Sequence, residues 1–417
     1  MVLNVENEMA DTLTHCRACQ TKNPYVFLPM GNHPPANMFV RPDEVGKEQP
    51  SYPLNTQVCL NCGLIQVADQ VPEDFFRHYL YVPSGAATMH SHFAELAKTL
   101  EKRADGELIV DIGCNDGLML AAANMNGSKT LGIDPAANLA KIAGERGVDV
   151  HVAYFNRETA ADVRDRHGPA MVIVTTNTFN HIGDLHGFVA AVMVLLNENG
   201  TLVIEVPWAK AIVETNEFDN VYHEHVSEMS LLSIVKLGEF FGLDVVDVHK
   251  LHVHGGSMRI FMRRREAGET QTPIVAQMLA EEGAAGLLKQ STYEDFARRV
   301  QEMKADLQRM LAGLKAQKMK LAGYGAPAKG NTLLNFFDIG TETLEFLVDR
   351  NPLKQGLFSP GKKIPIYGPE AIAEKKPDVL LVLAWNFFDE IREQQAGFEA
   401  AGGRFLVPLP IPRMVGG

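Results

Sequence analysis

Residues 108–117 read LIVDIGCNDG, an aliphatic run that ends in a carboxylate and a glycine-rich turn. A short run of this kind predicts a buried β-strand, and the turn opens a helix. Glycines at such a turn let backbone amides approach a ligand closely. Because Gly113 and Gly117 are spaced G-x-x-x-G and not G-x-G-x-x-G, the loop differs from the dinucleotide-binding fingerprint and indicates a mononucleotide-type site.

Similar runs alternate with helical stretches at 130–134 (TLGID), 148–154 (VDVHVAY), 171–177 (MVIVTTN) and 201–207 (TLVIEVP). This alternation predicts a parallel, doubly wound α/β sheet. Charged, Ala- and Leu-rich residues 273–318 predict linking helices, with a capping-box start at Ser291 and Glu294. The alternation then restarts, which predicts a second and smaller α/β unit with strands at 320–325, 344–349, 378–385 and 404–410.

The charge balance, with 39 Lys and Arg against 51 Asp and Glu, gives a formal net charge of −12. A negative protein repels a polyanionic backbone, so we expect no nucleic-acid partner. No apolar run approaches the roughly 20 residues of a membrane span, and the first residues lack the pattern of a secretory signal. We therefore expect a cytoplasmic protein without a membrane partner.

Four of the five cysteines form two Cys-x-x-Cys pairs, Cys16 with Cys19 and Cys59 with Cys62. In a reducing compartment this spacing indicates metal binding before disulfides, and four thiolates close the tetrahedral shell of a structural Zn²⁺. The alternative is four free buried thiols. We expect a zinc-binding domain at 1–75, a central domain at 76–272, and a helical linker with the C-terminal α/β domain at 273–417.

Asp134 ends the strand-like run after the glycine loop, where a carboxylate can accept hydrogen bonds from both hydroxyls of a ribose. Asp111, the two glycines and Asp134 together resemble the pattern of class I methyltransferases. That resemblance implies a Rossmann-like central domain that binds S-adenosylmethionine, with the amino-acid end of the cofactor on the loop. The expected cofactor contacts are Asp111, Gly113, Asn115, Gly117, Asp134, Asn177 and Phe179.

Residues 222–225 read YHEH and place a phenol, two imidazoles and a carboxylate just after the fifth strand of the central domain. Methyl transfer to carbon requires a base that removes a C–H proton and a group that stabilises the developing oxyanion. Histidine suits the first role, and Tyr or Glu can orient it. A metal site is the weaker interpretation, because His223 and His225 would face opposite ways in an extended segment. A solvated loop is the other alternative.

The chain contains, in this order, the motifs CRAC, CLNCG, DIGCNDG, YHEH, HGGSMR, GYGAPAKGNTLLN and VDRNPLKQG. Together they resemble the sugar C-methyltransferase family over nearly the whole chain. The family methylates a carbon of nucleotide-linked deoxy-keto-sugars. The resemblance implies a zinc-binding N-terminal domain, a central cofactor domain and a second Rossmann-like domain that helps to clamp the nucleotide. One departure follows YHEH, where the family continues with aromatic residues and this chain has Val226, Ser227, Glu228 and Met229.

The resemblance also assigns roles to residues. It implies that His225 is the base and that Tyr222, Glu224, His181 and either Tyr79 or Tyr81 surround the reacting sugar. Gly323 and Gly325 would lie beside the nucleotide or its diphosphate. The expected substrate-binding residues are His223, His254, Gly256, Ser257, Arg259, Tyr324, Lys329, Asn331 and Lys354.

Other functions fit parts of the sequence. A class I methyltransferase acting on oxygen or nitrogen of a small metabolite would share the cofactor loop but would not need a base that forms an enolate. An NAD-dependent sugar oxidoreductase could use the C-terminal half as its cofactor domain. A third alternative is a zinc-linked binding module without catalysis.

Overall fold

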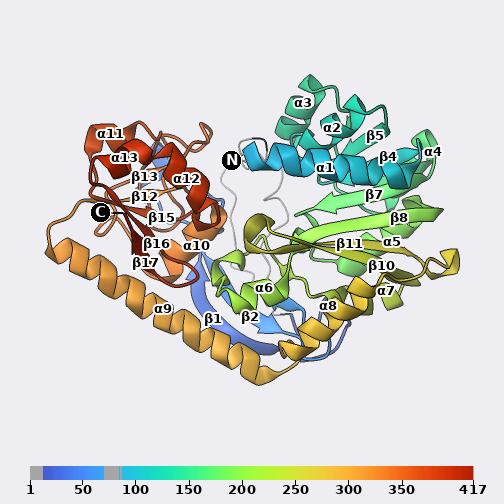
Figure 1. Cartoon of the computed structure of the whole chain (residues 1–417), viewed down its shortest axis with the longest axis horizontal. Coiled ribbons are helices and arrows are strands. Elements are labelled where there is room, and N and C mark those ends of the chain that lie inside the picture. Colours follow the sequence, from blue (N-terminus) through green and yellow to red (C-terminus); the bar gives the residue numbers. More distant parts are fainter. Residues whose placement is uncertain (1–12, 70–83, 85–86, 417) are drawn as a thin grey trace.

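Three β-sheets organise the residues that the computed structural model describes, which are 13–69, 84 and 87–416 (Figure 1). The side chains of Ala87 and His254 lie outside that description. Two large sheets occupy opposite ends of the molecule, and the small N-terminal sheet lies between them at the base (Figure 1). The α/β class expected for both larger units is confirmed.

The central sheet has seven strands in the order β10-β11-β8-β7-β4-β5-β6. Strands β4 to β8 pair in parallel, whereas β11 and β10 extend the sheet with antiparallel pairing. The chain moves outward in both directions from β4, so the carboxyl end of β4 lies at the topological switch point where α/β sheets bind ligands. The strands are β4 (Leu108–Ile112), β5 (Lys129–Ile133), β6 (Val150–His151), β7 (Ala170–Thr176), β8 (Leu196–Pro207), β10 (Leu243–Leu251) and β11 (Ser257–Arg264).

Helices cover both faces of this sheet. Helices α1, α2 and α3 contribute apolar residues to one hydrophobic cluster with the sheet, and α4, α5 and α7 contribute to another. Their bounds are α1 (Ala87–Ala104), α2 (Leu118–Met125), α3 (Ala137–Glu145), α4 (Arg157–His167), α5 (Leu185–Leu195), α6 (Ala209–Glu214) and α7 (Leu231–Glu239).

The N-terminal sheet contains a strand from the middle of the chain. Its order is β1 (Tyr25–His33), β2 (Tyr52–Val58), β3 (Ile65–Val67) and β9 (Ser227–Glu228). Buried Arg17 crosses the same junction, because its Nη1 donates to the carbonyl of Val67 at 2.8 Å and to that of Val226 at 3.0 Å. The segment that follows YHEH is therefore fixed by the N-terminal domain. The boundaries drawn at 75 and 272 stay a prediction.

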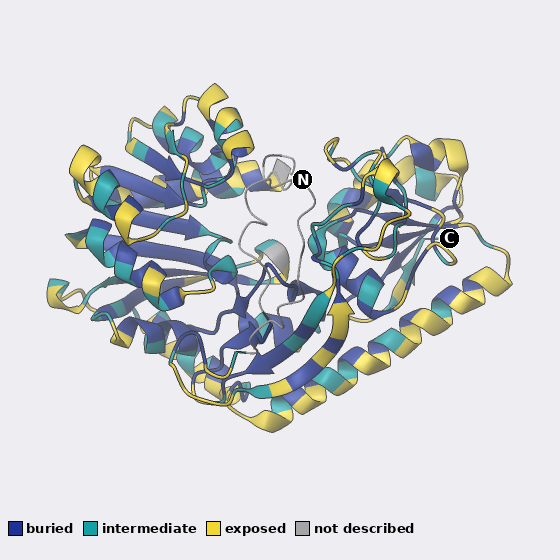
Figure 2. Cartoon of the chain, turned by 180° about the vertical axis from the view of Figure 1, so that it is seen from behind, coloured by how far each residue is buried: buried dark blue, intermediate teal, exposed yellow. Residues whose placement is uncertain are grey.

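Two helices, α8 (Pro273–Ala284) and α9 (Gln290–Ala316), connect the large sheets, as expected. The capping box expected at Ser291 and Glu294 is wrong, because α9 starts at Gln290 without a side-chain cap. The Glu294 carboxylate instead accepts from the Gln290 side chain at 2.7 Å. One face of α9 is exposed along its length (Figure 2). Among the described residues, no helix is both long and apolar enough to cross a membrane.

The C-terminal sheet has six strands in the order β14-β13-β12-β15-β16-β17, parallel except for β17. The four strands predicted in this region correspond to β12 (Leu321–Tyr324), β13 (Leu347–Val348), β15 (Val379–Val382) and β16 (Arg404–Val407). The edge strands β14 (Ile366–Tyr367) and β17 (Arg413–Val415) were not predicted. The helices are α10 (Ala328–Phe336), α11 (Ala371–Lys375), α12 (Phe388–Gln394) and α13 (Ala396–Ala400).

We expect Arg17→Ala to lower the melting temperature, because the Val67 and Val226 carbonyls both lose a buried donor. The Val226 carbonyl keeps the N–H of Val67 at 3.1 Å, so the expected loss is that of about one unsatisfied group, roughly 1–3 kcal/mol. Thermal unfolding followed by circular dichroism measures the change. Arg41→Ala is the control, since the Arg41 side chain is 66% exposed and its ion pair with Glu44 contributes little. Equal melting temperatures for both variants would show that the Arg17 contacts do not hold the junction.

Candidate active site

The carboxyl ends of parallel strands from both large sheets line one cleft of about 1260 Å³. From the central sheet come residues that follow β4, β5 and β7, and from the C-terminal sheet residues that end or follow β12, β13 and β15. Pockets for one small ligand measure roughly 300–1,000 Å³. The cleft therefore has room for two ligands, one on each wall.

Backbone geometry explains the glycines of the cofactor loop. Gly113 and Gly117 have φ values of 77° and 72°, in the left-handed region that favours glycine. A Cβ at Gly113 would collide with the side chain of Thr178, and one at Gly117 would lie 2.8 Å from the Cβ of Ala143. Both positions therefore require glycine for the turn and for close packing around it.

Asp134 is held in place by the loop. One carboxylate oxygen accepts the backbone N–H of Asn115 at 2.9 Å, and the other accepts that of Ala136 at 2.8 Å. Burial raises the pKa of Asp134, while these two hydrogen bonds oppose the shift. The carboxylate lines the cleft at the end of β5, the position that suits a pair of ribose hydroxyls.

Asp111 offers a second polar anchor on the same wall. Its side chain is buried, and Oδ1 has no hydrogen-bond partner among the described residues. Burial and then the neighbouring Asp134 raise the pKa of Asp111 to about 8. A buried carboxylate oxygen without a partner fits a donor from a ligand, such as the ammonium group of S-adenosylmethionine. The loop thus fits the cofactor that the sequence predicts.

Three of the catalytic candidates lie together in the cleft. The hydroxyl of Tyr222 lies 2.5 Å from Nε2 of His225, and their rings stack with centroids 4.0 Å apart. The His181 ring is perpendicular to that of His225 at 4.7 Å, and burial lowers the pKa of His181 to about 4. All three side chains line the cleft. They bring a phenol and two imidazoles together, and their catalytic roles stay a prediction.

The other two residues of YHEH face the N-terminal sheet. Glu224 accepts the backbone N–H of Asn37 at 3.2 Å, and burial raises the pKa of its carboxyl to about 7. Nε2 of His223 lies 3.0 Å from the carbonyl oxygen of Pro53. His223 also borders the cleft, whereas Glu224 does not. His223 and His225 have different partners, and within the part of the chain that the structure describes they belong to no group that could hold a metal ion.

On the opposite wall, cations surround the first turn of α10. Lys329 lines the cleft, with Nζ 3.9 Å from Glu217 and 5.6 Å above the ring of Trp385. Lys354 is buried, and its Nζ donates to the carbonyl of Ala326 at 2.9 Å. Sequence reasoning missed Arg350, which also lines the cleft and follows a strand-ending Asp in the VDRNP motif.

Several expected contacts lie away from the cleft lining. Arg259 is buried against Glu205, with Nε donating to the carboxylate at 2.7 Å. The same carboxylate lies 2.6 Å from His92, a residue that sequence reasoning missed. The Asn331 amide donates to the carbonyl of Ala36 at 2.8 Å. Tyr79, Tyr81 and the side chain of His254 lie outside the described residues. Also absent from the lining are Gly117, Phe179, Gly256 and Ser257.

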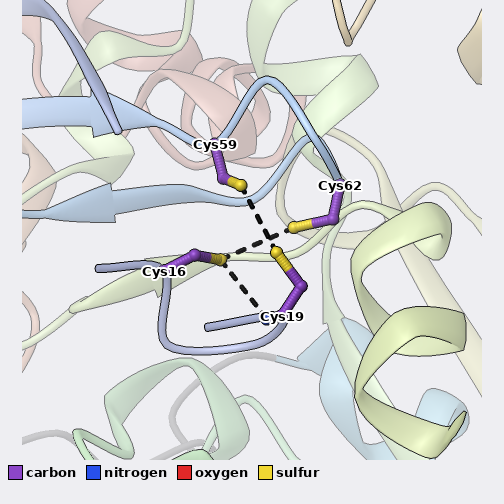
Figure 3. A group of neighbouring side chains, drawn as sticks. All are labelled: Cys16, Cys19, Cys59 and Cys62. Atoms are coloured by element: carbon purple, nitrogen blue, oxygen red, sulfur yellow. Dashed lines mark hydrogen bonds between the residues drawn. The ribbon is translucent and has the colours of Figure 1, made fainter. Parts of the chain in front are cut away.

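The four cysteines of the two Cys-x-x-Cys pairs converge in the N-terminal domain (Figure 3). Their sulfur atoms all lie within 4.8 Å of one another, with 3.5 Å between Cys16 and Cys62 and between Cys19 and Cys59. Tetrahedral Zn–S bonds of about 2.3 Å place sulfurs about 3.8 Å apart. The cluster therefore has the size and donor set of a structural zinc site.

Comparison with known proteins agrees with this organisation. Residues 16–76 match a family described as "Putative zinc binding domain", residues 86–248 match "Methyltransferase domain", and residues 252–410 match "C-methyltransferase C-terminal domain". The chain is 38% identical to the C-methyltransferase NovU of Streptomyces niveus over 408 residues, which is 97% of each chain.

The fold, the cofactor loop and these matches define an S-adenosylmethionine-dependent methyltransferase with a zinc-binding domain. More narrowly, the chain belongs to the family of C-methyltransferases that includes NovU.

Solved structures of methyltransferases match less than half of the chain. One from Anabaena variabilis is 13% identical, with a TM-score of 0.35, and the match covers 43% of this chain and 86% of that one. Magnesium protoporphyrin IX methyltransferase from Synechocystis, with bound S-adenosylmethionine, is 10% identical, with a TM-score of 0.32 and coverage of 42% and 79%.

We expect Asp134→Ala to weaken binding of S-adenosylhomocysteine, because each hydrogen bond to a charged group is worth roughly 1.5–3 kcal/mol. The affinity should fall at least about tenfold, measured by titration calorimetry. Asp149→Ala is the matched control, because Asp149 comes directly before the neighbouring strand β6 and its side chain is exposed. An unchanged affinity in the Asp134 variant would remove this carboxylate from the cofactor site.

We expect elemental analysis to find about one zinc per chain, because four thiolates fill a tetrahedral shell. Cys59→Ser should lose most of the metal. Cys114→Ser should keep it, because the fifth cysteine lies in the cofactor loop. Zinc retained in full by the Cys59 variant, or absent from the unmodified protein, would contradict the site.

Proposed function

We propose that the protein transfers a methyl group to a carbon atom beside the ketone of a nucleotide-linked deoxy-keto-sugar, with His225 as the base. The observation that carries the proposal is the Tyr222–His225 pair, which lines the same cleft as the cofactor loop, with the His181 ring 4.7 Å from that of His225. Methyl transfer to oxygen or nitrogen needs no base that ionises a C–H bond, whereas transfer to carbon does.

Proton removal defines the roles of the side chains. His225 takes the proton from the carbon next to the ketone, and the electron pair moves onto the ketone oxygen as an enolate. Enolate formation needs a donor or positive charge near that oxygen, a role that Tyr222 or His181 can fill from the same cluster. S-adenosylmethionine, when bound by the loop, supplies the methyl group that the carbon then receives.

The shape and charge of the cleft support a long, anionic substrate. The C-terminal sheet presents its strand ends to the cleft, and α10 begins there after Gly325, whose φ is 87°. A glycine turn that leads into a helix N-terminus favours a phosphate group. Lys329 and Arg350 add local positive charge to a protein whose net charge is −12. A nucleotide on this wall would leave its sugar near His225.

A zinc ion bound by the four cysteines would have a structural role. Four thiolates leave no coordination position for water or substrate, so the metal takes no part in chemistry. The Ser230 hydroxyl, which caps α7, donates to the carbonyl of Cys62 at 2.8 Å. A zinc-stabilised knuckle would therefore help to hold the segment that follows His225.

We expect His225→Asn to lose about 10²–10⁴-fold in turnover, the usual contribution of a general base, while still binding S-adenosylhomocysteine. Methyl transfer to candidate nucleotide-linked keto-sugars is followed by mass spectrometry, and carbon NMR locates the new methyl group. His249→Asn is the control, because that histidine is 45% exposed and lies outside the cleft lining. A methyl group found on oxygen or nitrogen, or near-normal turnover by the His225 variant, would refute the mechanism.

A further inference from the structure

We propose that Glu228 is the positioning residue of the base, holding the His225 ring by Nδ1 and stabilising the imidazolium that forms when the ring takes a proton. The proposal rests on the proposed role of His225 as a base and names a residue that the sequence did not single out for catalysis. In this proposal the charge of Lys329 also acts on the Glu228–His225 pair, in addition to any contact that Lys329 makes with substrate.

The geometry places the His225 ring between two partners. Nδ1 lies 3.2 Å from Oε1 of Glu228, and Nε2 lies 2.5 Å from the Tyr222 hydroxyl. A carboxylate that accepts Nδ1–H leaves the lone pair on Nε2, which is the atom on the side of the phenol. Glu228 thus fixes which nitrogen can receive a proton.

The backbone around Glu228 is rigid enough for this task. Glu228 is 1% exposed and lies in strand β9, where it pairs with Ile65 of β3. Ser230, two residues later, caps helix α7 and contacts the zinc knuckle. The backbone that carries Glu228 is therefore held on both sides, by strand pairing before it and by the cap of α7 after it, and its carboxyl group contacts Nδ1 of His225 through Oε1.

The charges around Glu228 come from several elements. Lys329 lies on α10. Glu217 lies in the loop before Tyr222, and Asp219 lies on the short helix Phe218–Asn220. Burial raises the pKa of Glu228 well above its ordinary value, Lys329 lowers it, and Glu217 raises it. Asp219 is fixed by the indole N–H of Trp385 at 2.8 Å. One lysine thus faces three buried carboxyl groups.

This arrangement favours positive charge on the His225 ring. Burial disfavours the charge of an ionised Glu228, and an imidazolium in contact with it compensates that charge. The Glu228 carboxylate should therefore raise the pKa of His225 and make the ring a stronger base toward a C–H proton. Lys329 favours the ionised form of Glu228, so the C-terminal domain contributes to the base through its charge.

Glu228→Gln tests the proposal, because it keeps the shape of the side chain and removes the charge. We expect kcat to fall about 10- to 100-fold, as when a hydrogen bond to a charged group is lost, while KM for both substrates changes less than about twofold. Only the neutral His225 ring can accept a proton, so activity falls at low pH. This decrease is the acid limb of the pH profile. Because the carboxylate raises the pKa of His225, this acid limb should move to lower pH in the variant.

Nitrogen NMR of histidine-labelled protein gives a readout that needs neither cofactor nor substrate. The signal absent from His225→Asn identifies the ring, and in the unmodified protein its neutral form should carry the proton on Nδ1. In Glu228→Gln the pKa of His225 should be lower. Glu228→Asp restores the charge and should return the acid limb toward its original pH. If the Gln variant does not fold, the unmodified protein decides the question, because a neutral His225 ring with its proton on Nε2 would overturn the proposal.

Glu282→Gln is the matched control. Glu282 is also a buried carboxyl group, but it accepts from Trp208 at 2.6 Å and from the first N–H groups of α7 and has no contact with His225. This variant should lose stability without moving the acid limb. An acid limb and a His225 pKa that stay unchanged in Glu228→Gln would overturn the proposal. A methyl group on oxygen would instead refute the proposed function and leave the NMR result standing.

Discussion

The pairing of β3 with β9, reinforced by the guanidinium of Arg17, is the contact on which the arrangement of the active site depends. It connects the sheet next to the cysteine cluster with residues 226–228, directly after the YHEH segment. Residues that follow a strand in an α/β fold usually form a loop with considerable freedom. Here they are paired, buried and bonded to a second domain. The His225 ring, which we propose as the base, therefore lies next to structure that two domains form together.

Division of the cleft between two sheets gives a protein with a net negative charge a separate wall for the anionic substrate that we propose. The wall that carries the cofactor loop is acidic, with Asp111 and Asp134. The opposite wall is mixed, because Lys329, Arg350 and Lys354 line it together with Asp349 and Glu390. A cofactor with a positive sulfonium and ammonium suits the first wall, and a diphosphate suits the second. Because the two walls differ in charge, each ligand is favoured on its own side of the reacting centre.

Sequence reasoning succeeded where the chemistry is local. The spacing of Gly113 and Gly117 reflects two left-handed backbone positions, and the carboxylate at Asp134 follows from where its strand ends. It was less successful where a side chain chooses among several partners. Arg259 follows a glycine pair and appears ready for substrate, yet it compensates buried Glu205 from the neighbouring strand. No local pattern shows that pairing, because the two residues are 54 positions apart.

The sequence by itself determined the α/β class, the cofactor loop, the two cysteine pairs and the YHEH segment as the catalytic candidate. Each of these depends on backbone conformation or ligand chemistry over a few neighbouring residues. Only the tertiary structure decided that Glu224 faces Asn37, that Glu228 meets His225, and that Lys329 reaches Glu217 from the other large domain. Burial and strand register fix those contacts, and both come from elements far apart in the chain.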